Sequence, residues 1–123
     1  MTTGSSPALA LYGEGGRIVC DRCEVAAGPV SRARGLLGRN GLAPGEGLLL
    51  RPTFSIHTFF MRFPIDAVFI DRGGRVVAVV RRLRPWRAAT RLRARAVLEL
   101  GAGEAERVKI RVGERLELGQ VGT

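Results

Sequence analysis

The sequence predicts a mainly β domain, a β-sandwich or a barrel-like fold, with one or two short helices. Six or seven short apolar runs, several of which alternate with polar residues, are separated by turns rich in glycine and proline, and this spacing is typical of sandwiches and barrels. The composition agrees, because 46% hydrophobic and 25% charged residues in a chain of 123 are ordinary values for one globular domain.

Each expected strand is an apolar or alternating run that ends at a turn signal. Residues 65–70 are apolar on both faces except for Asp66, so this strand is expected at the centre of the fold, between two layers. The glycine-rich residues 71–75 should form a hairpin turn into the next strand. Short helices are expected over residues 31–37, which Ser31 can cap, and over residues 102–110. The other expected strands are residues 17–25, 45–50, 55–61, 76–80, 96–100 and 113–118.

One domain is expected over residues 17–118. Residues 1–16, rich in Gly, Ser and Thr, are expected to be a flexible N-terminal tail, and residues 119–123 a short C-terminal tail. No apolar run reaches the ~20 residues that a membrane-spanning helix needs. The first sixteen residues also lack the positively charged start of a secretion signal. The sequence therefore predicts a soluble, cytoplasmic protein without a membrane span.

Four segments carry a resemblance to a known family. They are RGLLGR at 34–39, EGLLL at 46–50, HTFFMRFPIDAVFID at 57–71, and the pair VLEL at 97–100 and GERL at 113–116. In this order they resemble the bacterial and archaeal family known as domain of unknown function 192. The resemblance extends over about residues 17–118. It implies a compact β-rich fold, no agreed biochemical function and no catalytic residues. Many members look exported, and this chain's different start favours an intracellular branch.

The block at 57–71 is the most specific part of the resemblance, which concentrates any site around Met61, Pro64 and Asp66. In a strand, His57 and Met61 share one face. Two interpretations stay open: a pocket where an apolar wall meets converging polar groups, or a structural corner in which Asp66 binds turn amides. A buried Asp66 needs such a partner, or Arg62, in either case. The predicted pocket residues are His57, Thr58, Met61, Arg62, Pro64 and Asp66. A small ligand bound there is the leading functional prediction.

The two cysteines are expected to be reduced and free of metal. Cys20 and Cys23 form a CxxC pair in a strand-like segment, whereas a redox pair normally opens a helix. With one histidine in the chain they fall one ligand short of a zinc site. A soft-metal site would require His57 and Met61 to join them from a distant segment. The sequence therefore predicts no metal and no cofactor.

A hydrolase is the third functional candidate and the weakest. Ser31 or Ser55 could join His57 and Asp66 in a catalytic triad, but Ser55 and His57 are two apart on one expected strand. The chain also lacks a nucleophile-elbow motif. No other catalytic signature is present, so the sequence leaves open whether the protein is an enzyme.

Positive charge gathers in one part of the chain. The net charge is +9, and residues 72–95 hold nine arginines, no acidic residue and the one tryptophan, Trp86. This segment is either a solvated surface of an arginine-rich composition or an anion-binding surface for nucleic acid or an acidic partner. The predicted anion-binding residues are Arg81, Arg82, Arg84, Trp86 and Arg87.

We favour the compositional interpretation of this charge over the nucleic-acid one. Alternating strand geometry should scatter the arginines over several directions. Some of them should then pair with Glu99, Glu114 or Glu117, and Trp86 should pack into the core.

Overall fold

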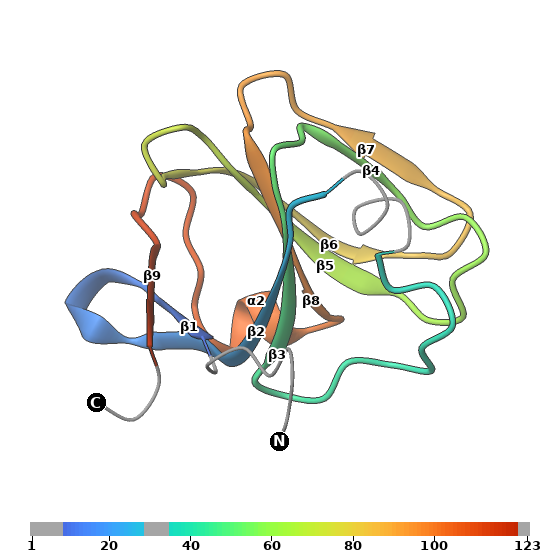
Figure 1. The fold of residues 1–123 in the computed structure, drawn as a ribbon, viewed down its shortest axis with the longest axis horizontal. Helices are drawn as coiled ribbons and strands as arrows, with labels where there is room; N and C mark the ends of the chain where they lie inside the picture. Colours follow the sequence, from blue (N-terminus) through green and yellow to red (C-terminus); the bar gives the residue numbers. More distant parts are fainter. Residues whose placement is uncertain (1–8, 29–34, 121–123) are drawn as a thin grey trace.

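The computed structural model describes residues 9–28 and 35–120 (Figure 1). In this part of the chain the fold is mainly β, as the sequence predicted, with one α-helix, α2, and one 3-10 turn, η1. The strands are β1 (Leu9–Tyr12), β2 (Ile18–Ala26), β3 (Glu46–Leu50), β4 (Ser55–His57), β5 (Ile65–Ile70), β6 (Val76–Leu83), β7 (Ala88–Thr90), β8 (Ala96–Gly101) and β9 (Glu117–Gln120). The helical segments are η1 (Glu14–Gly16) and α2 (Glu104–Arg107).

Seven strands form one curled sheet in the order β6-β5-β8-β3-β2-β1-β9, and β4 and β7 form a separate pair. Only β2 and β3 are parallel among the described strand pairs. The two edges of the large sheet approach each other where Arg75 and Arg115 form an isolated antiparallel bridge. Backbone hydrogen bonds from Val76 N to Glu114 O (2.9 Å) and from Gly113 N to Val76 O (2.7 Å) support this bridge. The described sheet is therefore barrel-like without being a closed barrel.

The central strands bury both of their faces. On β5, Val68 and Ile70 face the inside of the curl, while Ala67 and Phe69 face β4 and β7. The prediction that residues 65–70 form a strand buried between two layers is confirmed, since all six residues of β5 are buried. The inner core consists of Leu11, Val19, Cys20, Cys23, Leu49, Val68, Ile70, Val76, Leu98, Leu100, Ala105, Val108, Ile110 and Leu116. The outer core consists of Ala26, Leu36, Leu48, Leu50, Ile56, Met61, Ile65, Ala67, Phe69, Ala94 and Val97.

The prediction of a tail over residues 1–16 is wrong from Leu9 onward. Residues 9–12 form β1, which pairs with both β2 and β9, and Leu11 is buried in the inner core. The short apolar run therefore belongs to the sheet in spite of its glycine-rich surroundings. The expected tail at 119–123 is likewise wrong for residues 119 and 120, which lie in β9. Residues 1–8 and 121–123 lie outside the described residues.

Other element boundaries also differ from the sequence predictions. The strand expected at 55–61 ends at His57, because Thr58 N bonds to Arg87 O at 2.8 Å and the chain turns. The helix expected at 102–110 is the single turn of α2, and the one expected at 31–37 falls largely outside the described residues. In the described part of the chain no helix is long and apolar enough to cross a membrane.

Candidate functional site

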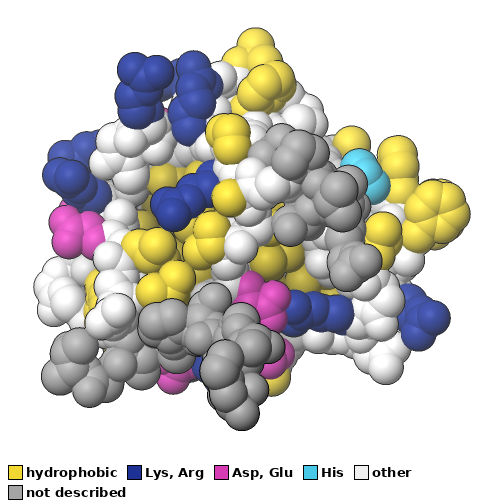
Figure 2. Space-filling view, viewed as in Figure 1, with side chains coloured by type: hydrophobic (Ala, Val, Ile, Leu, Met, Phe, Trp, Pro, Cys, Tyr) yellow, Lys and Arg dark blue, Asp and Glu magenta, His cyan; other side chains and the backbone are white. Residues whose placement is uncertain are grey.

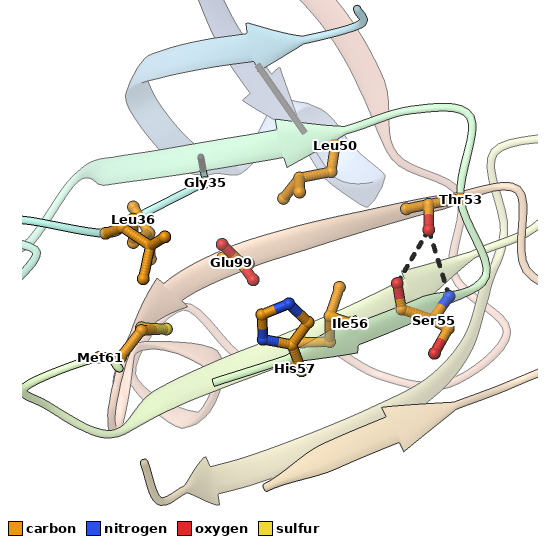
Figure 3. A pocket seen from close by; sticks show the side chains of 10 residues that line it. Gly35, Leu36, Leu50, Thr53, Ser55, Ile56, His57, Met61 and Glu99 are labelled. Carbon is orange, nitrogen blue, oxygen red and sulfur yellow. Dashed lines mark hydrogen bonds between the residues drawn. The ribbon is translucent and has the colours of Figure 1, made fainter. Parts of the chain in front are cut away.

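A cavity of about 220 Å³ lies between the curled sheet and β4 (Figure 3). Aliphatic side chains form most of its wall, and four polar residues interrupt that wall. The cavity is lined by Gly35, Leu36, Leu37, Leu50, Thr53, Ser55, Ile56, His57, Met61 and Glu99. Segments that are far apart in the sequence thus meet at one small hollow.

Glu99 is the buried acid of this cavity. It lies in β8, where Leu98 and Leu100 point into the inner core, so strand alternation turns Glu99 to the outer face. The side chain is 3% exposed, and its Oε1 has no hydrogen-bond partner among the described residues. Burial raises the pKa of Glu99 to about 7. Figure 3 shows the carboxyl group pointing into the space between Leu36 and His57.

From the sequence, Glu99 was expected only as a partner for an arginine. The signal that could have found it is a lone carboxylate in the middle of the apolar run VLEL. Such a residue must find a partner or remain costly, because removing a carboxylate from water is unfavourable. At neutral pH this group can bind a cation or exchange a proton.

His57 ends β4 at the mouth of the cavity. Its Nδ1 accepts a hydrogen bond from Phe59 N at 3.2 Å, so the neutral ring carries its proton on Nε2 and can donate from there. The ring also stacks on Phe59, with 4.9 Å between the ring centroids. Among the described residues no hydrogen bond or ion pair joins His57 to Glu99, although both line the same cavity.

Among the described residues, the serine triad considered from the sequence is not assembled. Ser55 Oγ shares a hydrogen bond with Thr90 Oγ1 at 2.7 Å, and Ser55 N donates to Thr53 Oγ1 at 3.3 Å. Asp66 lies on the inner side of β5, away from this cavity. The other serine considered, Ser31, falls outside the described residues.

The predicted pocket residues separate into two groups. His57 and Met61 line the cavity. Thr58 is buried and holds a turn, because its Oγ1 donates to Arg84 O at 2.6 Å. Arg62 and Pro64 are exposed, and Arg62 Nη1 donates to Asn40 Oδ1 at 3.0 Å.

Asp66 is a structural residue of the inner side. It is fully buried and accepts hydrogen bonds from the amides of Arg82 (2.9 Å), Gly103 (3.0 Å) and Ala105 (2.9 Å). The prediction that Asp66 is buried and bound to backbone amides is confirmed. Its assignment to the same pocket as His57 is wrong, because alternation along β5 turns Asp66 toward Ala105 of the inner core, whereas His57 of β4 lines the outer cavity.

Both cysteines lie in the inner core. Cys20 pairs with Leu11 and Cys23 pairs with Leu9, and the register shift between them is a β-bulge that places both thiols on one face. The hydrogen bond that the Cys23 thiol donates to Cys20 lowers the pKa of Cys20 and raises the pKa of Cys23. The soft-metal site considered from the sequence is not assembled among the described residues. The two cysteines belong to the inner core, whereas Met61 belongs to the outer core.

The arginines of residues 72–95 do not form the ion pairs that were predicted for them. All nine arginines of residues 72–95 are exposed, and within the described ranges none of them forms an ion pair. Glu114 pairs instead with Arg17 at 2.8 Å, and Glu117 with Arg115 at 3.9 Å. Figure 2 shows Lys and Arg side chains at several separate places on one face of the molecule. This scatter fits a compositional origin, although the predicted pairing was wrong.

Trp86 does not pack into the core, contrary to the prediction. It is 55% exposed and contacts Phe59 and Phe60, with centroid distances of 5.9 Å and 4.6 Å. We call these three residues the aromatic cluster. Phe60 and Trp86 both have φ of 66°, a left-handed conformation that costs a non-glycine residue on the order of 1–3 kcal/mol. Tertiary contacts thus hold an exposed aromatic group beside Arg84 and Arg87.

Comparisons with known proteins agree on a family. The family model DUF192, described as an uncharacterised ACR, matches residues 12–118. A UPF0127 protein of Pyrococcus abyssi is 35% identical over 103 residues, which cover 78% of this chain and 85% of that protein. A UPF0127 protein of Pyrococcus horikoshii is 41% identical over 64 residues, 51% of this chain and 55% of that protein.

Two crystal structures share the fold. A protein of unknown function from Novosphingobium aromaticivorans has a TM-score of 0.78 at 23% identity, and the match covers 93% of this chain and 94% of that one. A putative transcription regulator from Sinorhizobium meliloti has a TM-score of 0.77 at 27% identity, covering 92% and 95%. The first of these supports the architecture alone.

Proposed function

The chain belongs to the DUF192 family, and we propose that it is a small-ligand-binding domain whose site is the cavity of Glu99, His57 and Met61. The observation that carries this proposal is the buried Glu99 carboxyl group, whose Oε1 has no partner among the described residues. Such a group lowers stability unless something binds it. A ligand that supplied the missing hydrogen bond would offset that cost. A cytoplasmic location stays a prediction from the sequence.

The lining indicates the chemistry of the ligand. Leu50, Ile56 and Met61 give the cavity apolar walls, so most of the ligand should be apolar. Glu99 would bind a cationic or hydrogen-bond-donating group, and His57 Nε2–H could donate to an acceptor at the mouth. The cavity of about 220 Å³ is smaller than the ~300–1,000 Å³ of pockets for drug-sized molecules. A small primary amine with a branched apolar body fits this description.

Isopentylamine is a suitable probe, and isopentanol is its neutral counterpart. Titration calorimetry at pH 8 should detect binding of the amine to the wild type. The affinity of Glu99→Gln for the amine should be about tenfold lower, because one charge-assisted hydrogen bond is lost. Glu106→Gln is the matched control, since Glu106 is exposed and does not line the cavity. Equal amine affinity in the wild type and Glu99→Gln, or no amine binding at all, would contradict the proposal.

A second candidate function is binding of single-stranded nucleic acid at the aromatic cluster. The exposure of Trp86 favours it, because exposed aromatic rings beside arginines can stack on bases while the arginines contact phosphates. Quenching of the one tryptophan by a single-stranded oligonucleotide should then weaken steeply with salt. Calorimetry measures the affinity of the variants, which lack the fluorescent tryptophan. Trp86→Phe should keep the affinity for the oligonucleotide, and Trp86→Ala should lose it. Binding no tighter than the ~10⁻⁴–10⁻⁶ M of non-specific cationic contacts would reject this candidate.

A further inference from the structure

We propose a second binding site, at the open mouth of the curled sheet, for a small amphipathic anion: an apolar tail with a carboxylate-type head group. A cavity of about 560 Å³ opens there, within the ~300–1,000 Å³ range of small-molecule pockets. It lies on the inner side of the central strands, whereas the Glu99 cavity lies on the outer side. The second site therefore stands independently of the proposed function.

The floor of this second cavity is apolar. Leu11 from β1, Leu49 from β3 and Leu116 ahead of β9 line it, and all three belong to the inner core. Leu118 of β9 also lines the cavity and remains 37% exposed. Figure 2 shows hydrophobic side chains gathered on the left half of the molecule with a basic side chain lying across them. An apolar tail on this floor would remove leucine surface from water.

The rim of the cavity is basic. Arg51, Arg72 and Arg95 line it and come from three different connections, β3–β4, β5–β6 and β7–β8, so only the fold brings them together. All three are exposed, and none forms an ion pair in the part of the chain that the structure describes. Arg95 Nη1 donates to Leu92 O at 3.1 Å and to Ala94 O at 2.8 Å, which holds this guanidinium in place.

Asp71, the acid on the rim, offsets only part of the charge of these three arginines. Asp71 Oδ1 accepts the amides of Gly73 and Arg75, each at 2.9 Å, and so serves the turn. An excess of positive charge remains over an apolar floor. The shared chemistry of floor and rim is complementary to an anionic head group on an apolar tail, because guanidinium groups bind carboxylates through charge-assisted hydrogen bonds.

The test uses octanoate, with octanol and octylammonium as the neutral and cationic counterparts. Octanoate should bind the full-length protein at least about tenfold more tightly than octanol, the ratio expected for one charge-assisted hydrogen bond. Two-dimensional amide NMR should place the largest shifts at Ala96 and Leu116 rather than at His57 and Met61. Octanol binding as tightly as octanoate, or no octanoate binding below its micelle concentration, would overturn the proposal.

Matched variants separate this site from general positive charge and from the first cavity. Arg72→Gln with Arg95→Gln should weaken octanoate binding about tenfold or more. Arg81→Gln with Arg93→Gln removes the same charge from exposed residues outside the cavity lining and should leave the affinity unchanged. Glu99→Gln should also leave it unchanged. Equal losses in the two arginine pairs would overturn the proposal without bearing on the first cavity.

Discussion

Two acids on neighbouring central strands show opposite outcomes of burial. Asp66 on β5 accepts three backbone hydrogen bonds, whereas Glu99 on β8 keeps one oxygen without a partner in the described structure. Both are single carboxylates in apolar runs, so the sequence alone does not distinguish them. The difference comes from distant amides, such as that of Gly103, which meet Asp66 only in the folded chain.

The pH dependence of stability should report Glu99. The pKa rises from 4.5 to about 7 on folding, so well below pH 4.5 the carboxyl group is protonated in both states and its titration does not alter stability. As the pH rises from 4.5 through 7, the unfolded state loses its proton first and stability falls. A shift of this size corresponds to about 3 kcal/mol. Urea unfolding of the wild type and of Glu99→Gln between pH 4 and 8 measures it.

The difference in stability between the wild type and Glu99→Gln isolates the titration of Glu99. Hydrogen bonds from Arg107 lower the pKa of Glu104, so Glu104 contributes stability that is lost as the pH falls, equally in both proteins. The difference curve should therefore be flat below pH 4.5 and should favour Glu99→Gln above pH 7. A difference that stayed constant from pH 4 to 8 would show that Glu99 titrates normally.

Asp66→Ala should be destabilising, because it leaves three backbone donors without their acceptor. The expected loss is about 3 kcal/mol, given ~1–3 kcal/mol for each buried unsatisfied group and partial access of water. Chemical denaturation measures it. The exposed Asp21 supplies the control, and Asp21→Ala should change the free energy of unfolding by less than about 0.5 kcal/mol. Similar effects of the two substitutions would refute the structural role of Asp66.

At the scale of elements, periodic patterns predicted the central strands well and the peripheral ones poorly. The runs at 45–50, 65–70 and 96–100 correspond to β3, β5 and β8 within a residue or so, because burial on both faces demands continuous apolar residues. The turn after His57 was missed because tertiary bonds impose it, such as that from Trp86 N to Thr58 O at 3.0 Å. The short strands β1 and β7 carry too few residues to show a period.

The strand β1 offers a direct test of its place in the sheet. Leu11 is 3% exposed in the inner core, so Leu11→Ala should cost ~2–5 kcal/mol of unfolding free energy. Ile18→Ala on β2 is the control, since Ile18 is 53% exposed and should change stability by less than about 0.5 kcal/mol. If residues 9–12 were a tail, both substitutions would be neutral in thermal and urea unfolding.

At the scale of the whole molecule, the two cores share their central strands. Residues of β3, β5 and β8 contribute to both the inner and the outer core. Neither core can therefore be lost without the strands of the other, and unfolding should be a single transition. The inner core holds both thiols, and the one tryptophan lies in the aromatic cluster, so the two sides carry separate natural probes.

Urea curves from these probes should coincide. Tryptophan fluorescence reports the side of β4 and β7, and labelling of Cys20 and Cys23 by a short pulse of thiol-reactive dye reports the inside of the curl. Equal midpoints are expected, because the shared strands couple the cores. A fluorescence midpoint at lower urea than the labelling midpoint would mean that the outer side unfolds separately.

The candidate site was partly predictable from sequence. His57 and Met61 were placed in a pocket because a specific block surrounds them, and both line the observed cavity. Glu99 was missed because its role depends on the pairing of β8 with β3 and β5. This pairing brings Glu99, 42 positions after His57 in the sequence, to the lining of the same cavity. Which strands are neighbours is a property of the whole fold rather than of any one segment.

The bridge between Arg75 and Arg115 also bears on how copies of this protein meet in a crowded solution. An open sheet presents two rows of unpaired amides and carbonyls on which another chain can extend the sheet. Here the two rims are joined at one end. Farther along, the outermost strand β6 carries Arg81 and Arg82, and charge on an edge strand discourages edge-to-edge aggregation. Whatever the origin of the arginine excess, Arg81 and Arg82 lie where their charge opposes pairing of this edge with another sheet.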